Sequence, residues 1–375
     1  MKKTAVVSTT IRVPKMLEDY CRNANTYHHD NIKMFVVGDK KTPSEARQFC
    51  DRLFETYRIP VRYLGIEEQE KNLKDFPKLL EIIPYNSGCR KLLGMLIAYL
   101  EGYANLITVD DDNFATDQDF FGYHDIVGEE VELPLVESSS GWFNTCDYLI
   151  EENNIPFYYR GIPWSQRKVK KDPVTWHQTK LKVVANSGFW LGDPDIDASS
   201  RLFWPIRVTG MRPEVEPNFG LYPGTWCPFN NQSTAMAREI LPAYFTPHNA
   251  KRFGDIWPAY VVCCIAGHLN HVVSYGFPFV RQIRNPHNYW TDIDDEKVGA
   301  QATEPLVDLL RSAKLVGNNY HDCLEELVSH MNSQSAMLEK YPQDQQEMLT
   351  DFIKNLGVWH EVFNSVKKRQ STTVD

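Results

Sequence analysis

Three consecutive aspartates, Asp110 to Asp112, follow the apolar run LITV and close a stretch that is typical of a β-strand. Because side chains alternate across an extended chain, Asp110 and Asp112 can point to one face while Asp111 points to the other. Two carboxylates at a strand end can hold a divalent cation, Mn²⁺ or Mg²⁺, that also bridges a diphosphate. An acidic turn that simply ends the strand is the alternative interpretation, because aspartate is common in turns.

The absence of several other motifs excludes some functions for the aspartates. The sixth position from Asp110 is Ala115, where an EF-hand requires glycine, so that kind of calcium loop is excluded. The chain has no P-loop, GxSxG or GxGxxG motif, which argues against a P-loop NTPase, an α/β-hydrolase and a typical NAD enzyme. The DxD element of nucleotide-sugar transferases works by the same logic, since its metal offsets the negative charge of a departing nucleoside diphosphate.

The first 115 residues alternate strand and helix signals, and this alternation would position the aspartates. The segment 42–57 is typical of a helix, with Thr42 as N-cap, Pro43 in the first turn and apolar residues at helical spacing. Such alternation predicts an α/β fold with a mostly parallel central sheet and helices on both faces. Strands are expected at 4–10, 34–39, 61–65 and 105–113, and a second helix at 86–103.

Polar residues follow the expected carboxyl ends of these strands. Ligands of parallel α/β sheets bind beyond that edge. The rule places along one rim of the sheet the residues Thr10, Arg12, Gly38, Asp39 and Asp110 to Asp112. We therefore expect the ligand site there.

The rest of the chain divides into three parts by composition. Residues 116–300 are rich in aromatics, Pro and Gly, and we expect loops and mixed strands that complete the site. Residues 301–366 have a helical pattern, which can form a dimer surface or a cap over the sheet. Residues 367–375 are typical of a solvated, flexible tail.

Composition limits the possible classes of protein. The chain has 375 residues, of which 42% are hydrophobic and 24% charged, so it can bury a sizeable core. A net charge of −9 argues against a general nucleic-acid binder. The longest apolar run, 92–100, is about half the ~20 residues of a membrane-spanning helix. The eight cysteines contain no CxxC pair, which favours a reducing, cytoplasmic location.

Several segments, in order, resemble the reversibly glycosylated polypeptide family, known in plants as UDP-arabinopyranose mutases. The most specific is RGIPWSQR at 160–167, which lies at the right distance after ITVDDDNF at 107–114. The resemblance covers roughly residues 5–330. The other matching segments are TIR at 10–12, VVGD at 36–39, GCRKLLG at 88–94, FNT at 143–145, FWLGDPDIDA at 189–198 and RFGDIWPAY at 252–260.

The resemblance implies a GT-A-like nucleotide-diphospho-sugar fold that uses UDP-sugars with Mn²⁺ or Mg²⁺. This fold would occupy residues 1–300, with a nucleotide-binding half at 1–115 and a sugar or acceptor half at 116–300. In the family, the arginine that matches Arg160 becomes reversibly glycosylated, and the arginine that matches Arg167 has a supporting role. The family's mutases interconvert pyranose and furanose forms of UDP-arabinose, and its members form homo- or hetero-oligomers.

With a UDP-sugar as the expected ligand, further residues receive roles. Arg12 and Arg90 are expected to bind phosphate in bidentate fashion. Asp39 can accept hydrogen bonds from the uracil or ribose, or can simply be a turn residue. Trp190 can pack against the sugar or fill the core.

Arg160 is an unusual nucleophile, because a guanidinium stays protonated below a pH of about 12. If it carries sugar, nearby carboxylates must assist proton loss, and Asp195, Asp197 and Asp255 are the candidates. The alternative is that Arg160 only clamps a phosphate or carboxylate.

Three hypotheses for the function follow. The first is a metal-dependent UDP-sugar enzyme that glycosylates its own Arg160, as part of a mutase cycle or without one. The second is a glycosyltransferase that passes sugar to a separate acceptor, and the third is a non-catalytic subunit of a glycosyltransferase complex.

Overall fold

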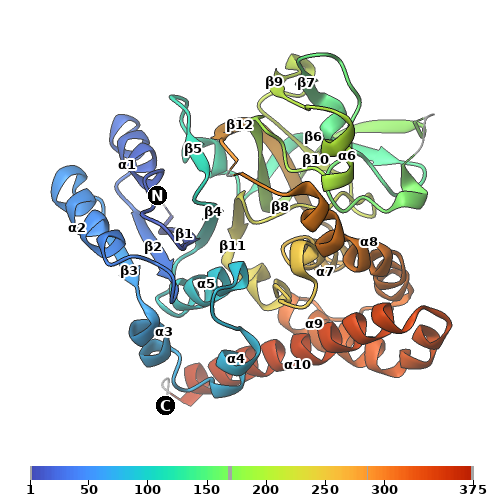
Figure 1. Cartoon of the computed structure of the whole chain (residues 1–375). Helices are drawn as coiled ribbons and strands as arrows, with labels where there is room; N and C mark the ends of the chain where they lie inside the picture. Colours follow the sequence, from blue (N-terminus) through green and yellow to red (C-terminus); the bar gives the residue numbers. More distant parts are fainter. Residues whose placement is uncertain (1, 168–170, 285, 373–375) are drawn as a thin grey trace.

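The computed structural model describes residues 2–167, 171–284 and 286–372. The strands form one sheet, and helices lie on both of its faces (Figure 1). Its strands are β1 (Thr4–Thr10), β2 (Ile32–Gly38), β3 (Val61–Leu64), β4 (Asn105–Val109), β5 (Asn113–Ala115), β6 (Glu130–Ser138), β7 (Leu149–Glu151), β8 (Val174–Gly192), β9 (Val208–Met211), β10 (Asn218–Leu221), β11 (Ser233–Ala237) and β12 (His271–Gln282). The α-helices are α1 (Leu17–Thr26), α2 (Glu45–Tyr57), α3 (Ile66–Asn72), α4 (Pro77–Ile82), α5 (Lys91–Leu100), α6 (Ala198–Phe203), α7 (Trp257–His268), α8 (Tyr289–Ser312), α9 (Tyr320–Ser333) and α10 (Gln343–Thr372). The C-terminal part of the chain forms the helices α8, α9 and α10.

The N-terminal strands form the parallel part of the sheet, in the order β3-β2-β1-β4. Their continuous apolar runs suit strands that are covered on both faces. Helix α5 packs closely against them at Gly94, where a Cβ atom would lie 2.5 Å from Val37 Cγ2 and 2.8 Å from Val7 Cγ1. The register aligns Thr10 with Gly38, so the carboxyl ends of β1 and β2 meet at one rim.

The second half of the sheet mixes parallel and antiparallel pairs. Strand β11 lies antiparallel between β4 and β8, with Ser233 opposite Val109. Strand β8 then pairs with β6 in antiparallel and with β12 in parallel orientation. The predicted α/β class is confirmed, and the parallel pairing expected from the first 115 residues holds for β1 to β4.

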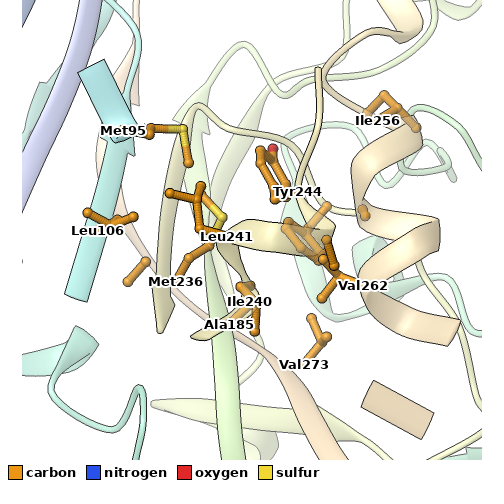
Figure 2. Packing of buried hydrophobic residues seen from close by; sticks show 14 of the residues in the cluster. Met95, Leu106, Ala185, Met236, Ile240, Leu241, Tyr244, Ile256, Val262 and Val273 are labelled. Carbon is orange, nitrogen blue, oxygen red and sulfur yellow. The ribbon is translucent and has the colours of Figure 1, made fainter. Parts of the chain in front are cut away.

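The apolar core is continuous across the two halves. Figure 2 shows Met95 of α5, Leu106 of β4, Met236 of β11 and Val262 of α7 within one cluster, and each is fully buried. The packed core therefore fixes the carboxyl end of β4 relative to β11 and α7, which follow β8 in the chain.

Helices α8, α9 and α10 pack onto this core. Trp359 of α10 is fully buried, and its indole Nε1 donates to the carbonyl of Leu241 at 3.1 Å. Trp257 of α7 meets Phe352 of α10 edge-to-face, with ring centroids 5.2 Å apart. These contacts are those of a cap, one of the two roles expected for this segment.

The C-terminal helix is longer than the predicted helical segment. Helix α10 continues to Thr372, past residue 366, and residues 373–375 of the predicted tail lie outside the described residues. The predicted domain boundaries stay predictions. Within the described ranges, no helix combines the length and the apolar character needed to cross a bilayer.

Candidate active site

Two adjoining cavities lie at the rim where β1 and β4 end. The larger, which we call the large cavity, has a volume of about 510 Å³, and the small cavity has about 230 Å³. Asp110, Arg252 and Asp255 line both cavities, so the two form one continuous site. The large cavity is also lined by Thr9, Asn86, Ser87, Gly88, Cys89, Lys91, Asn231, Thr246, Pro247, His248, Lys251, Gly254 and Asp295. The small cavity is also lined by Asp112, Arg160, Asp195, Gln232, Gln282, Arg284 and His287.

The three aspartates lie in a turn, which corrects the strand predicted for 105–113: β4 ends at Val109, β5 begins at Asn113, and the Asn113 N–H donates to the Asp110 carbonyl at 3.2 Å. Their side chains still separate, although not by alternation along an extended strand. Asp110 and Asp112 both line the small cavity, whereas Asp111 accepts a hydrogen bond from the Thr10 hydroxyl at 2.7 Å. Asp110 forms an ion pair with the buried ammonium of Lys91. Asp112 has a buried oxygen, Oδ1, that has no hydrogen-bond partner among the described residues. The geometry therefore points two carboxylates into one cavity.

These residues fit a hard divalent cation. The unpartnered Asp112 Oδ1 and the unpartnered Gln282 Oε1 belong to the lining of the same small cavity as the Asp110 carboxylate. No cluster of three or more His, Cys, Asp or Glu suited to a metal occurs in the described parts of the chain. Ions such as Mg²⁺ are commonly held by one or two carboxylates plus substrate phosphates and water, so water and the phosphates of a ligand would complete this set.

Asp112→Asn should stabilise the metal-free protein at neutral and higher pH. Burial, followed by the charges of Asp110 and Asp111, raises the pKa of Asp112 to about 7, whereas an unfolded aspartate titrates near a pKa of about 4. The folded state thus holds an extra proton between these values, and its stability falls as pH rises through this window.

Thermal unfolding in EDTA tests this expectation. The stability gain of Asp112→Asn should be on the order of 2 kcal/mol at pH 8 and negligible at pH 4. An equal gain at both pH values would contradict the raised pKa.

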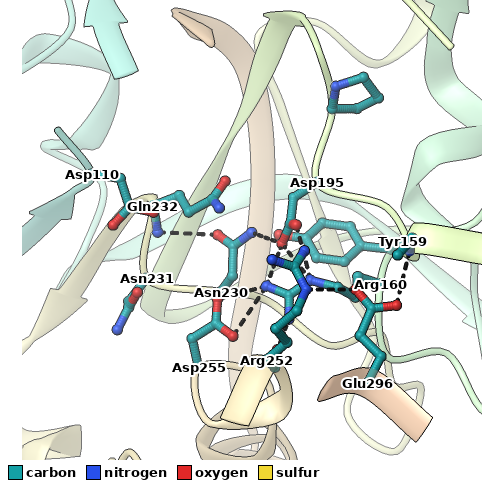
Figure 3. Close-up of polar contacts among 12 residues, drawn as sticks. Asp110, Tyr159, Arg160, Asp195, Asn230, Asn231, Gln232, Arg252, Asp255 and Glu296 are labelled. Atoms are coloured by element: carbon teal, nitrogen blue, oxygen red, sulfur yellow. Dashed lines mark hydrogen bonds and ion pairs between the residues drawn. The ribbon is translucent and has the colours of Figure 1, made fainter. Parts of the chain in front are cut away.

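Arg160 is the centre of a buried polar network in the wall of the small cavity. The guanidinium is bound on two sides, because Nε and Nη2 donate to Asp195 at 2.8 to 3.1 Å and Nη2 also donates to Asp255 at 2.8 Å (Figure 3). Its Nη1 donates to the backbone carbonyl of Arg252. Asn230 supports the arrangement by donating to Asp195 Oδ2 at 2.7 Å. Arg160, whose side chain is 4% exposed, is thus held in one orientation.

The two carboxylates differ in their affinity for protons. Burial alone would raise the pKa of Asp195, but the Arg160 guanidinium lowers it to about 2. Burial raises the pKa of Asp255, and Arg160 offsets this only in part because Asp195 adds negative charge. Burial opposes the charged form of Arg160, yet Asp195 and Asp255 together raise the pKa of Arg160 well above its ordinary value. Asp255 is therefore the carboxylate of this pair that can accept a proton.

Gly161→Ala should disturb the site and destabilise the fold. Gly161 has a φ of +101°, and a Cβ atom there would overlap the Ile256 side chain. We expect a loss of about 3 kcal/mol in the free energy of unfolding, from backbone strain plus overpacking. Gly224 is a matched control, because its φ is +97° and nothing lies within 4 Å of its Cβ position. Denaturant unfolding should give Gly224→Ala a cost of only about 1 kcal/mol; equal costs would contradict the packing argument.

Arg167 and Asp197 form a separate pair. Arg167 Nη1 lies 2.5 Å from Asp197 Oδ2, and Arg167 Nε donates to the carbonyl of Ile162 at 3.0 Å. The guanidinium also covers the Trp164 ring at 4.3 Å from its centroid. Of the three carboxylates predicted to assist Arg160, the structure brings Asp195 and Asp255 to it and gives Asp197 to Arg167. These contacts tie Arg167 to the loop that carries Arg160, and a supporting role for Arg167 stays a prediction.

Arg90 and Asp39 lie beneath the rim. Arg90 is 2% exposed, with Nε donating to Gln69 Oε1 at 3.1 Å and lying 3.8 Å from the Asp39 carboxylate. Asp39 accepts from the backbone N–H of Lys40 at 2.7 Å and of Ser87 at 3.3 Å. Arg90 lies among neither cavity's lining residues, and phosphate binding by its guanidinium stays a prediction. Asp39 is a turn residue, since its carbonyl accepts from the N–H of Thr42 at 2.9 Å.

The remaining predicted site residues fall into two groups. Thr10 orders the rim, because its hydroxyl binds Asp111 and accepts from the N–H of Arg12 at 2.9 Å. The Arg12 side chain is exposed at the same rim. Trp190 is fully buried and packs on Tyr159 with ring centroids 5.2 Å apart, which favours the core interpretation over contact with a sugar.

Sequence reasoning missed several residues of the site. Lys91 is the most informative, because a lysine that opens the apolar helix KLLGMLIAYL is a visible signal of a buried charge. Asn230 and Arg252 gave no such signal, since each acts through contacts more than 30 residues away in the chain.

Comparison with known proteins adds a family to this geometry. The family model described as "Reversibly glycosylated polypeptide" matches residues 71–363, which is most of the chain. The chain belongs to the reversibly glycosylated polypeptide family. The family predicted from the DDD and RGIPWSQR segments is thereby confirmed. Membership also agrees with the predicted GT-A-like α/β fold, whose parallel strands β3-β2-β1-β4 the structure contains.

Other comparisons are more distant. No curated protein matches the chain. Glucosyl-3-phosphoglycerate synthase from Mycobacterium tuberculosis, solved with Mn²⁺ and UDP-glucose, is 10% identical with a TM-score of 0.41, over 85% of each chain. The mannosyltransferase PcManGT from Pyrobaculum calidifontis, solved with GDP-mannose and Mn²⁺, is 11% identical with a TM-score of 0.36, over 95% of this chain and 87% of that one.

Proposed function

We propose that this protein is a metal-dependent UDP-sugar enzyme that cleaves the sugar–diphosphate bond and carries the sugar reversibly on Arg160. The observation that carries the proposal is that Arg160 and the pair Asp110 and Asp112 line one cavity, although they are separated by almost 50 residues in the sequence. Family membership adds weight, because Arg160 matches the glycosylated arginine. Return of the sugar from Arg160 to UDP in another ring form would make the protein a pyranose/furanose mutase.

We assign the following roles to the residues that line the small cavity. Asp110 and Asp112 would hold Mn²⁺ or Mg²⁺, and the bound metal would offset the charge that develops on the departing diphosphate. Asp195 orients the Arg160 guanidinium through both Nε and Nη2. In the transfer step, a C–N bond forms between the anomeric carbon and an Arg160 nitrogen, and the C–O bond to the diphosphate breaks. UDP leaves with the electron pair of that bond, and the guanidinium proton passes to Asp255.

A second function, transfer of sugar to a separate acceptor, is favoured by one observation. Each nitrogen of the Arg160 guanidinium already donates to an acceptor, and both carboxylates stabilise its charged form. A charged, fully bonded guanidinium is a poor nucleophile and a good clamp for anions. In this version, Arg160 binds the substrate and the acceptor enters the small cavity.

Intact-mass spectrometry separates the two functions. The protein is incubated with a panel of UDP-pyranoses and UDP-furanoses plus Mn²⁺, and wild type is compared with Arg160→Lys and Arg207→Lys. Arg207 is a suitable control because it is exposed and pairs only loosely with Glu152, at 3.9 Å.

The lead proposal expects one glycosyl adduct that disappears in Arg160→Lys and persists in Arg207→Lys. Consumption of UDP-sugar without an adduct would support the separate-acceptor transferase. If the protein neither forms an adduct nor turns over a UDP-sugar, both enzymatic proposals fail and the non-catalytic subunit is left. Assembly into homo- or hetero-oligomers and a cytoplasmic location are further parts of the proposal.

A further inference from the structure

Lys91 is a buried cation at the edge of the proposed metal site. It is the first residue of α5 and is 1% exposed. Its ammonium contacts the Asp110 carboxylate, the carbonyl oxygen of Asn231 at 2.8 Å and the side-chain Oδ1 of Asn231 at 3.3 Å. These three acceptors match the three donors of an ammonium group. Among the recorded ion pairs of Lys91, Asp110 is the carboxylate that balances its charge.

A divalent ion and Lys91 need the same carboxylate. A metal bound by Asp110 would lie beside the ammonium, and two cations repel strongly where water is scarce. Removing Asp110 from Lys91 would also leave a buried charge without its partner, which is costly. In the free protein, Lys91 therefore competes with the metal for Asp110.

An anion in the large cavity would relieve this competition. Lys91 lines that cavity together with Ser87 and Gly88, which lie at the start of the turn before α5. A diphosphate bound there offers the ammonium new acceptors, and Asp110 is then available to the metal. The chemical class that fits is a nucleoside diphosphate, since one phosphate must reach the metal and another must reach Lys91.

We propose that Lys91 couples the binding of the divalent cation to the binding of the nucleoside diphosphate. Without nucleotide it occupies Asp110 and keeps metal affinity low. With nucleotide it binds the diphosphate and releases Asp110 to the metal. Because such coupling is reciprocal, the metal must raise nucleotide affinity by the same factor. This inference rests on the proposed function, since it takes the diphosphate as that of a UDP-sugar.

Mn²⁺ titration followed by the electron paramagnetic resonance of free Mn²⁺, with and without saturating UDP, tests the coupling. In wild type, UDP should raise Mn²⁺ affinity at least about tenfold. In Lys91→Met, Mn²⁺ alone should bind about tenfold more tightly than in wild type, and the UDP effect should shrink to about threefold. Lys91→Arg keeps the competing cation, so its Mn²⁺ affinity without UDP should stay within about threefold of wild type.

Lys251→Met is the matched control for loss of charge alone. Lys251 lines the same large cavity, but it pairs with Asp295 at 2.6 Å and has no contact with Asp110 among its recorded pairs. Its removal should change Mn²⁺ affinity without UDP by less than about threefold. Equal effects of Lys91→Met and Lys251→Met, or an unchanged Mn²⁺ affinity in Lys91→Met, would overturn the proposal.

The outcomes also separate this inference from the proposed function. If wild type binds Mn²⁺ and UDP together but Lys91→Met leaves both affinities unchanged, the role of Lys91 is wrong and the proposed function stands. If wild type binds no UDP in the presence of Mn²⁺, both fail. Circular dichroism melting of each variant verifies that it is folded, and should Lys91→Met not fold, the inference is decided by Asn231→Ala. That variant removes the Oδ1 acceptor, so the Lys91 ammonium depends more on Asp110 and Mn²⁺ affinity without UDP should fall; an unchanged or higher affinity would also overturn the inference.

Discussion

Arg160→Met should lower the free energy of unfolding by about 3–5 kcal/mol, because it leaves buried carboxylates without their counter-ion. Asp195 has 1% of its side chain exposed and would have only the Asn230 amide as a nearby donor among its recorded hydrogen bonds. Asp255, with 21% of its side chain exposed, would lose its pairing at 2.8 Å. Urea unfolding at pH 7 measures this loss.

Two comparisons make the Arg160→Met prediction specific. The loss should shrink at pH 4, since protonation of Asp195 and Asp255 removes the uncompensated charge. Arg207→Met, which removes an exposed arginine, should cost less than about 1 kcal/mol. A pH-independent loss, or a loss no larger than that of Arg207→Met, would show that the network does not hold Arg160 as described.

Asp110→Asn combined with Asp112→Asn should weaken Mn²⁺-dependent binding of UDP by about 100-fold or more, because it removes both carboxylate ligands of the metal. Asp111→Asn is the matched control. Asp111 is adjacent in sequence but binds Thr10 instead of lining the small cavity, so its substitution should weaken binding by less than about tenfold. Isothermal titration calorimetry with UDP, in Mn²⁺ and in EDTA, gives these affinities.

UDP affinity measured in EDTA separates an effect of the substitutions on metal binding from an effect on the nucleotide site itself. Once the metal is removed, the double variant should bind UDP at least as tightly as wild type, because Lys91 no longer pairs with the Asp110 carboxylate. If the double variant binds UDP as tightly as wild type in Mn²⁺, or if Asp111→Asn is equally defective, the assignment of Asp110 and Asp112 to the metal is wrong.

Local patterns in the sequence were sufficient for the parallel half of the fold and for the acidic edge. Strand–helix alternation predicted β1 to β4, and the run of three aspartates marked the acidic edge, although these residues form a turn and not the end of the predicted strand 105–113. Both features depend on neighbours in the chain, which a single sequence contains. The antiparallel insertion of β11 between β4 and β8 depends on distant segments, and no local signal indicates it.

The network around Arg160 shows the limit of spacing arguments. Asp195 and Asp197 are two residues apart and were equally good candidates, yet the first binds Arg160 and the second binds Arg167. Asp255, 95 residues away, reaches Arg160 only because α7 and its preceding turn pack beside the 158–162 segment. The family resemblance indicated Arg160, and the three-dimensional packing shows which of the candidate carboxylates bind it.

The surroundings of Arg90 and Lys91 separate two neighbouring cations that the sequence could not tell apart. Arg90 follows the helix-opening turn and looked suited to phosphate, but its guanidinium is occupied by Gln69 and lies near Asp39 under the rim. Lys91, its neighbour, holds the place at the cavity wall instead. One position along the chain decides whether a cation at the start of α5 lines the large cavity or contacts the loop beneath it.

The most direct measurement is a crystal structure of the protein with UDP and Mn²⁺, with anomalous diffraction data collected at the manganese edge. We expect a single strong anomalous peak between the carboxylates of Asp110 and Asp112, with the diphosphate bound to the same ion. A nucleotide found elsewhere, or an anomalous map with no peak beside those two side chains, would contradict it.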